Sequence, residues 1–216
     1  SNTIQSLISS GISVYIGHNP ENVKNSDLVV YTAAISKEDP ELVMAHNLNI
    51  PTMERAVFLG LLTKCFEDTI TISGTHGKTT TTSMVSLCFL KADLNPSIQV
   101  GAYLKNISGN YAVGNSDYFI LEACEYVESF LHFFPKSAIV LNIDNDHLDY
   151  FKNIDNIQNA FSKYVKLLPS NGLLVLNCDD NRCLSLKNST KAEVITYGIN
   201  NTNADFIAKN IVFDDN

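Results

Sequence analysis

The feature that most constrains this fold is a strand, a glycine-containing loop and a helix in direct succession. Residues 69–73 (Thr-Ile-Thr-Ile-Ser) form a β-branched run typical of a strand, and a loop at 74–79 (GTHGKT) follows without a break. A helix-like run with apolar residues available for burial then extends over 80–93. This order indicates a phosphate-binding loop, because the loop N–H groups and the N-terminus of the helix can face one anion.

The loop offers groups suited to ATP and Mg²⁺. Lys78 would reach the β- and γ-phosphates, and the Thr79 hydroxyl would ligate Mg²⁺. The strict pattern GxxxxGK[ST] requires glycine at position 72, which is Ile72, so the loop is a shortened GTxGKTT variant. The alternative is a glycine turn before a helix with a surface lysine. The predicted nucleotide-binding residues are Gly74, Thr75, His76, Gly77, Lys78, Thr79 and Thr80.

Strand-like and helix-like runs alternate along the rest of the chain. The expected strands are 13–16, 28–31, 97–100, 118–121, 138–142, 173–176 and 194–197, with a further strand-like tail over 204–213. The expected helices are 40–47, a stretch that Thr52 can cap, and 154–168. The alternation predicts an α/β fold with a mainly parallel sheet.

Charge and composition disfavour several classes of function. Lys and Arg total 15 against 23 Asp and Glu, so the net charge is -8, which argues against a non-specific binder of nucleic acid or of anionic membranes. The five cysteines show no zinc-ligand spacing, which favours free thiols in a reducing compartment. No apolar run approaches the ~20 residues of a membrane helix, so we expect a cytoplasmic protein.

Three sequence blocks, in order, resemble those of the Mur ligases. The first is 73–82 (SGTHGKTTTT), in which a histidine within the loop and four threonines after the lysine are most similar to the alanine-adding members. The second, 121–131 (LEACEYVESFL), resembles the E-A-x-E block of the family. The third, 141–151 (LNIDNDHLDYF), resembles its N-I-x-x-D-H-x-D block. Segments 17–22 and 32–35 look like the end of the first domain of these enzymes.

The resemblance implies an ATP-dependent amide ligase of cytoplasmic peptidoglycan synthesis. Its alanine-adding members join L-alanine to the carboxylate of UDP-N-acetylmuramate through an acyl phosphate, with ATP and Mg²⁺ as cofactors. The implied catalytic residues are Lys78, Glu122 and His147, and the implied metal ligands are Thr79, Glu122 and His147. The implied organisation is a partial Rossmann-like, UDP-substrate-binding domain over 1–66, followed by an incomplete P-loop NTPase-like central domain over 67–216.

The predicted strands support the same site on physical grounds. Ligands of parallel sheets bind at the carboxyl ends of strands, and the loop, Glu122 and His147 all follow predicted strands. A sheet-end salt bridge is the alternative role for Glu122, and a polar loop cap is the alternative for His147. Glu125, Asp146 and Asn142 are weaker candidates for supporting positions.

The remaining candidates are weaker still. Several family members use a carbamylated lysine after the histidine block, and Lys163 lies at about that position, but a solvated lysine is the favoured reading. His18 and His46 are expected at the surface or in packing, and His132 beside Phe133.

Other functions stay open. Members of the family have three domains and this chain resembles parts of two, so we expect it to be inactive alone. A murein-tripeptide recycling ligase is the nearest alternative, and a non-catalytic nucleotide-binding module is another. A P-loop small-molecule kinase is disfavoured because the chain has only two arginines, Arg55 and Arg182, with which to stabilise a transferring phosphoryl group.

Overall fold

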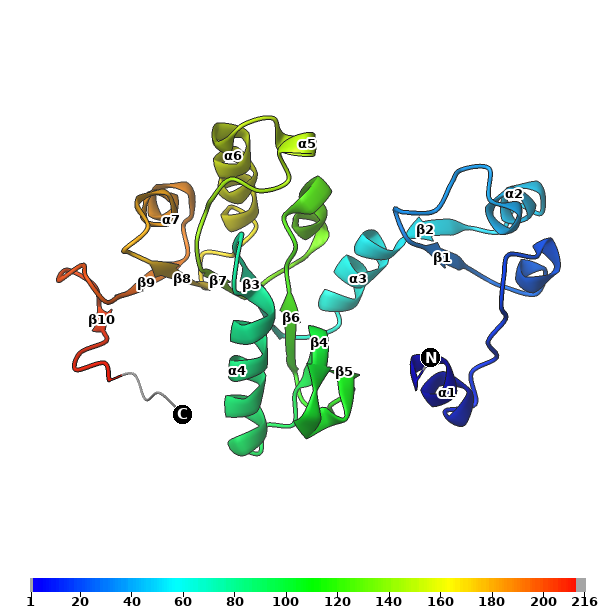
Figure 1. Ribbon diagram of the computed structural model, residues 1–216, viewed down its shortest axis with the longest axis horizontal. Coiled ribbons are helices and arrows are strands. Elements are labelled where there is room, and N and C mark those ends of the chain that lie inside the picture. Colours follow the sequence, from blue (N-terminus) through cyan, green and yellow to red (C-terminus); the bar gives the residue numbers. More distant parts are fainter. Residues whose placement is uncertain (1, 213–216) are drawn as a thin grey trace. The chain divides into compact units, whose positions relative to one another are not determined.

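The structure, a computed structural model, describes residues 2–212 and divides the chain into two compact units, 1–58 and 59–216 (Figure 1). The division falls inside helix α3 (Arg55–Thr63), earlier than the predicted boundary between residues 66 and 67. The reason lies in the second half of α3. A Cβ at Gly60 would come within 2.1 Å of the His132 carbonyl oxygen, so this half of the helix packs closely on the second unit.

The first unit is a small β-α-β arrangement with an additional helix. Its parallel strands β1 (Val29–Tyr31) and β2 (Thr52–Glu54) pair in the register Val29↔Thr52. Its helices are α1 (Asn2–Ser9), the 3-10 turn η1 (Pro20–Val23) and α2 (Pro40–Asn47). Val23, Leu42 and Ala45 are its buried apolar residues.

Two sequence expectations fail in this unit. Residues 13–16 are not a strand, and Tyr15 and Ile16 are largely exposed. A strand needs a hydrogen-bonding neighbour, and within residues 2–212 the sheet of this unit consists of β1 and β2 alone. Thr52 does not cap a helix. The pairing with β1 makes residues 52–54 extended, so the helix begins at Arg55. Helix α1 was not predicted.

The second unit is built on an eight-stranded sheet in the order β10-β9-β8-β7-β3-β6-β4-β5. Neighbouring strands run parallel except for the β4–β5 hairpin, which confirms the predicted α/β fold with a mainly parallel sheet. The strands are β3 (Asp68–Ser73), β4 (Ser97–Leu104), β5 (Gly109–Ala112), β6 (Tyr118–Glu122), β7 (Ser137–Val140), β8 (Leu173–Asn177), β9 (Glu193–Gly198) and β10 (Phe206–Ile207).

Helices cover both faces of this sheet. Successive residues of a strand point to opposite faces, and β3 follows that rule: Ile72 packs with Val85 and Phe89 of α4, whereas Thr71 meets Tyr164 of α6. The helices and 3-10 segments are α4 (Lys78–Lys91), η2 (Lys105–Ile107), η3 (Tyr126–His132), α5 (Leu148–Phe151), α6 (Ile154–Val165), α7 (Asn181–Ser185) and η4 (Leu186–Ser189).

The larger core lies on the α6 face and is centred on aromatic rings. The rings of Phe130 and Tyr164 stack with their centroids 4.5 Å apart, and the Phe161 ring meets the Phe130 ring edge-on with a centroid distance of 5.3 Å. The Tyr164 hydroxyl donates to Thr71 Oγ1 at 2.5 Å, and burial of the ring raises the pKa of that hydroxyl. This core supports β3 and β7, the two strands that carry the loop and the histidine block.

Several boundaries in this unit differ from the sequence expectations. Helix α4 begins at Lys78, two residues before the predicted start, because Gly77 adopts the left-handed conformation (φ 85°) that ends the loop. In the strand-like tail only Phe206–Ile207 pairs with β9, and residue 213 lies outside the described residues. The hairpin strand β5 and helix α7 were not predicted.

Two further expectations concern the whole chain. All five cysteines are free, as expected. Within residues 2–212, none of the helices is long and apolar enough to cross a membrane.

Candidate active site

The candidate site lies where three adjacent parallel strands end. β3 lies between β6 and β7, and their register places Ile72 opposite Glu122 and Ser73 opposite Val140. The loop leaves β3, Glu122 closes β6, and the segment that leads to His147 leaves β7. The fold therefore brings the three sequence blocks to one edge of the sheet, as parallel strands require.

The loop is pinned to the segment after β7. The Thr75 N–H donates to the Asn142 carbonyl at 3.1 Å, and the Asn142 side chain exchanges two hydrogen bonds with the His76 peptide, at 2.7 and 2.9 Å. Gly74 (φ 138°) allows this close approach, since a Cβ there would lie 3.0 Å from the Leu141 Cβ. The loop is thus ordered before the helix begins.

Lys78 is held in a closed set of contacts. Its Nζ donates to the carbonyls of Gly74 at 2.6 Å and Thr75 at 3.1 Å, and to both carboxylate oxygens of Glu125 at 3.0 and 3.2 Å. Glu125 is almost fully buried, with a 2% exposed side chain. The three ammonium protons are therefore already used, and a phosphate would have to replace one of these partners.

Thr79 and Glu122 form a second contact beside the first. The Thr79 hydroxyl donates to Glu122 Oε2 at 3.1 Å, and the Gly101 N–H donates to Glu122 Oε1. Strand β4, which carries Gly101, therefore orients the carboxylate toward the N-terminus of α4. A hydroxyl and a carboxylate oxygen are ligands that Mg²⁺ accepts, so this pair fits the cation that the sequence implies.

His147 does not join that pair. It occupies the N-cap position of α5 in a left-handed conformation (φ 49°) without a side-chain capping bond, and its Nε2 lies 3.9 Å from both Glu125 Oε1 and Asp146 Oδ2. The Tyr126 ring packs on the imidazole at 4.5 Å. One ligand atom from each of His147, Glu125 and Asp146 lies within 4.8 Å of the others, so this cluster is a second set of groups that could hold a cation.

The structure thus separates the implied metal ligands into two groups. Thr79 and Glu122 form one, and His147 with Glu125 and Asp146 forms the other. Lys78 connects them, because it precedes Thr79 on α4 and pairs with Glu125. Glu125, weighted lightly from the sequence, holds the most connected position. The signal that could have found it is the second glutamate of the E-A-x-E block, directly before η3.

Lys163 pairs with a residue outside both groups. Its Nζ pairs with Glu128 Oε1 at 2.8 Å, and its side chain is 53% exposed. The Glu128 carboxylate raises the pKa of this amine. Lys163 also lines a shallow cavity with Glu128, Tyr150, Phe151, Asn156 and Asn159.

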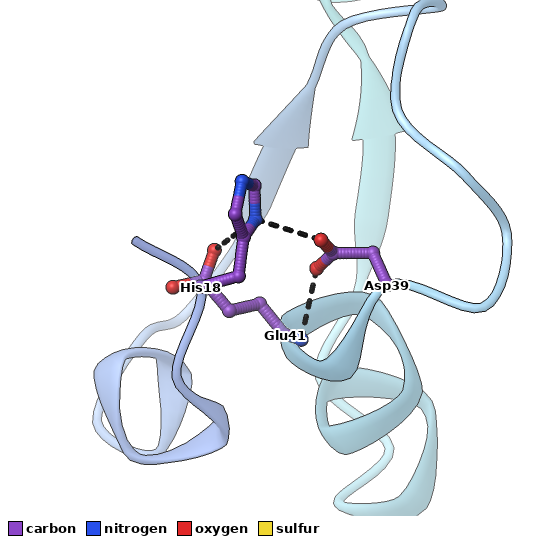
Figure 2. A group of neighbouring side chains, drawn as sticks. All are labelled: His18, Asp39 and Glu41. Carbon is purple, nitrogen blue, oxygen red and sulfur yellow. Dashed lines mark hydrogen bonds and ion pairs between the residues drawn. The ribbon is translucent and has the colours of Figure 1, made fainter. Parts of the chain in front are cut away.

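The first unit has its own ionisable cluster (Figure 2). His18 Nδ1 lies 2.7 Å from Asp39 Oδ2 and 3.7 Å from Glu41 Oε2. Asp39 caps α2 by accepting from the N–H groups of Glu41 and Leu42, and Glu41 Oε1 accepts from the Asn22 amide at 2.7 Å. These bonds tie the start of α2 to the turn at η1. His18 lies at the surface beside them, with a 56% exposed side chain. His46, expected at the surface or in packing, is exposed, and its Nε2 lies 3.4 Å from Thr52 Oγ1.

Family models match nearly the whole chain. The model "Mur ligase family, catalytic domain" matches residues 1–67, and that of the Mur ligase middle domain matches 72–216. The UDP-N-acetylmuramate--L-alanine ligase of Acetivibrio thermocellus is 50% identical over all 216 residues, which cover 46% of that protein. The enzyme of the same name from Clostridium novyi is 54% identical over 96% of this chain and 45% of its own length. The chain therefore spans about half the length of these curated relatives.

Solved structures share the fold. The crystal structure of a UDP-N-acetylmuramate-alanine ligase from Thermotoga maritima matches 91% of this chain and 44% of its own, with a TM-score of 0.80 and 28% identity. A UDP-N-acetylmuramate:L-alanyl-gamma-D-glutamyl-meso-diaminopimelate ligase from Neisseria meningitides matches 94% of this chain and 70% of its own. It also has a TM-score of 0.80, but only 24% identity, so it supports the fold alone.

Proposed function

The chain belongs to the Mur ligase family, and from that premise we propose that it is the nucleotide-binding part of an enzyme that joins L-alanine to the carboxylate of UDP-N-acetylmuramate. Residues 1–66 and 67–216 would contribute parts of two of its domains. The relatives with this activity are 50–54% identical across the chain, which favours alanine addition over recycling of a murein tripeptide. The kinase alternative stays disfavoured, because the chain has only two arginines with which to stabilise a transferring phosphoryl group.

One observation carries the nucleotide site. The N-terminus of α4 carries Lys78 and Thr79 between the carboxylates of Glu125 and Glu122, at the carboxyl ends of adjacent strands. An anion fits there, because the first N–H groups of a helix lack intrahelical acceptors and the helix dipole favours negative charge. The adjacent carboxylates suit the Mg²⁺ that accompanies ATP.

In the proposed reaction, the carboxylate of the sugar nucleotide attacks the γ-phosphate of ATP and gives an acyl phosphate and ADP. The amine of L-alanine then attacks the acyl carbon, and phosphate leaves. Lys78 would exchange Glu125 for β- and γ-phosphate oxygens and neutralise their charge. Thr79 and Glu122 would hold Mg²⁺, with the His147 group as a second place for a cation. Mg²⁺ would draw negative charge from the transferring phosphoryl group.

Binding is the first test. The chain would be titrated calorimetrically with a non-hydrolysable ATP analogue and Mg²⁺, alongside Lys78→Ala. The matched control is Lys91→Ala, at the other end of α4. We expect binding by the chain and by the control, and none by Lys78→Ala. Equal binding by Lys78→Ala would refute the site.

Catalysis is tested in a chain of the relatives' length that contains these residues. We expect ADP release that requires both UDP-N-acetylmuramate and L-alanine, with the amide product identified by its mass. Turnover with a murein tripeptide in place of L-alanine would favour the recycling ligase. Phosphorylation of an alcohol without any amine would favour a kinase, and binding without any turnover would favour a non-catalytic module.

A further inference from the structure

Asn142 holds two consecutive peptides of the loop. Its Oδ1 accepts from the His76 N–H at 2.7 Å, and its Nδ2 donates to the His76 carbonyl at 2.9 Å. Its own carbonyl accepts from the Thr75 N–H at 3.1 Å. The side-chain amide thus accepts one hydrogen bond from the His76 backbone and donates one to it, as a residue of a neighbouring strand would.

These bonds decide which loop groups can meet a phosphate. The N–H groups of Thr75 and His76 are directed to Asn142, whereas those in the first turn of α4, from Lys78 on, have no intrahelical acceptor. We infer that Asn142 is a positioning residue of the nucleotide site. It removes the His76 peptide from the phosphate donors and fixes the loop so that the first turn of α4 forms the anion-binding surface. This inference rests on the proposed function, in which the N-terminus of α4 with Lys78 and Thr79 binds ATP.

The amide suits this position better than a carboxylate. Asn142→Asp has nearly the same shape and retains an acceptor for the His76 N–H. It loses the donor to the His76 carbonyl, however, and adds a negative charge next to the incoming phosphates. Asn142→Ala removes both side-chain bonds. The two variants therefore separate loss of the hydrogen bonds from electrostatic repulsion.

Asn177 offers a matched control. It lies at the end of β8, the strand next to β7, and its Nδ2 donates to the Leu141 carbonyl at 3.1 Å. Its Oδ1 accepts from the Asp179 N–H at 3.0 Å. It therefore holds the residue beside Asn142 through the same kind of amide, but these two bonds do not involve the loop at 74–79. Asn177→Ala should reduce stability in a similar way without changing the phosphate site.

The experiment measures nucleotide affinity and amide exchange in the same proteins. The chain and its variants are titrated with the ATP analogue and Mg²⁺ at a temperature where each is folded, and exchange of the His76 amide is followed by NMR. We expect Asn142→Ala to bind about tenfold to thirtyfold more weakly, because the two side-chain hydrogen bonds that hold the loop are lost. Asn142→Asp should bind more weakly still, and Asn177→Ala within about twofold of the original chain. The His76 amide should exchange slowly in the original chain and quickly in Asn142→Ala.

The outcomes separate this inference from the proposed function. If Lys78→Ala loses binding while both Asn142 variants bind normally, the inference is wrong and the nucleotide site stands. If Asn177→Ala weakens binding as much as Asn142→Ala, the effect is general destabilisation, which also overturns the inference. If the original chain does not bind the nucleotide, the proposed function fails. Should Asn142→Ala not fold, the nucleotide affinity of Asn142→Asp and the exchange rate of the His76 amide in that variant decide whether the inference holds. Fast exchange of this amide in the original chain would contradict the pairing itself.

Discussion

Lys78 and Glu125 form an ion pair, with Nζ 3.0 Å from Oε2, at the point where the nucleotide phosphates are proposed to bind. The lysine is 16% exposed and the glutamate 2% exposed, so neither charge is well solvated. A buried carboxylate is costly without a partner, which explains why Lys78 turns back toward it rather than toward solvent. In the proposed function, nucleotide binding would therefore compete with Glu125 for the lysine.

This competition predicts a Mg²⁺-dependent effect of Glu125→Gln. The amide retains the shape but removes the charge that holds Lys78 and repels phosphate. Without Mg²⁺, the variant should bind the ATP analogue about tenfold more tightly than the original chain, since a close charged partner is worth on the order of 1–2 kcal/mol. With Mg²⁺ this advantage should shrink or reverse, because a candidate cation ligand has been lost. Calorimetry in EDTA and in Mg²⁺ measures both.

Glu128→Gln is the control for that experiment. Glu128 lies on η3, the 3-10 segment that begins directly after Glu125, but its carboxylate pairs with Lys163. Its neutralisation should leave nucleotide affinity unchanged in both buffers. Tighter Mg²⁺-free binding by Glu128→Gln would mean that overall charge, rather than the Lys78 pair, governs affinity.

Gly101 predicts a steric effect on the Thr79–Glu122 pair. A Cβ at this position would lie 3.0 Å from both Glu122 oxygens and from Thr79 Oγ1. Gly101→Ala should therefore displace the carboxylate and weaken Mg²⁺-dependent nucleotide binding by about tenfold, the cost of one misplaced charge-assisted contact. Gly109→Ala in the same hairpin is the control, because the nearest atom to its Cβ would be 3.7 Å away. Equal affinities of the two variants would contradict the orienting role of β4.

The sequence was sufficient to predict that the three blocks meet at one edge of the sheet, but not how their side chains pair. The strand–loop–helix order and the parallel alternation bring the loop, Glu122 and the His147 segment to one edge of the sheet, because parallel strands end at the same edge. The Lys78–Glu125 pair joins residues 47 positions apart. It depends on the turn after β6, where Val127 (φ 47°) and Glu128 (φ 55°) adopt a conformation that their residue types do not indicate.

The failures in the first unit have a different origin. Residues 13–16 have the composition of a strand, but strand formation requires a neighbour that composition does not reveal. Residues 52–54 show the reverse: Thr52 is a residue type that can cap a helix, but parallel pairing to β1 makes this segment extended. Long-range hydrogen bonding, rather than local propensity, decided both segments.

Asp179 predicts a pH-dependent contribution to stability. Its carboxylate accepts from the N–H groups of Ile199, Asn200 and Asn201, and these bonds lower its pKa below the ordinary value of 3.8. A lowered pKa means stabilisation that is present above 3.8 and lost as the pH falls through the folded-state value. Asp179→Asn should therefore have a lower melting temperature at pH 7, with the difference from the original chain narrowing toward pH 2. A constant difference would indicate that the charge is not responsible.

Lys163 is predicted to remain an unmodified amine. Carbamylation requires the neutral amine, and the bond to Glu128 raises the pKa of Lys163, which keeps it protonated at neutral pH. Incubation with ¹³C-bicarbonate should give no carbamate signal by NMR. Lys163→Ala should leave nucleotide affinity unchanged. A carbamate signal that disappears in Lys163→Ala would show that the Glu128 pair opens readily and would assign the modification.

Tyr164 provides a test of the core that is independent of the nucleotide. Its buried hydroxyl donates to Thr71 Oγ1, and the Thr71 hydroxyl in turn donates to the Ser137 carbonyl at 3.1 Å. Tyr164→Phe should lower the free energy of unfolding by about 1 kcal/mol, because one buried hydrogen bond is lost while Thr71 keeps its acceptor. Urea unfolding of Tyr164→Phe, Thr71→Val and the double variant measures the coupling. Additive losses of stability would contradict a direct bond between the two hydroxyls. Nucleotide affinity should stay unchanged in Tyr164→Phe, since its ring still packs on Phe130.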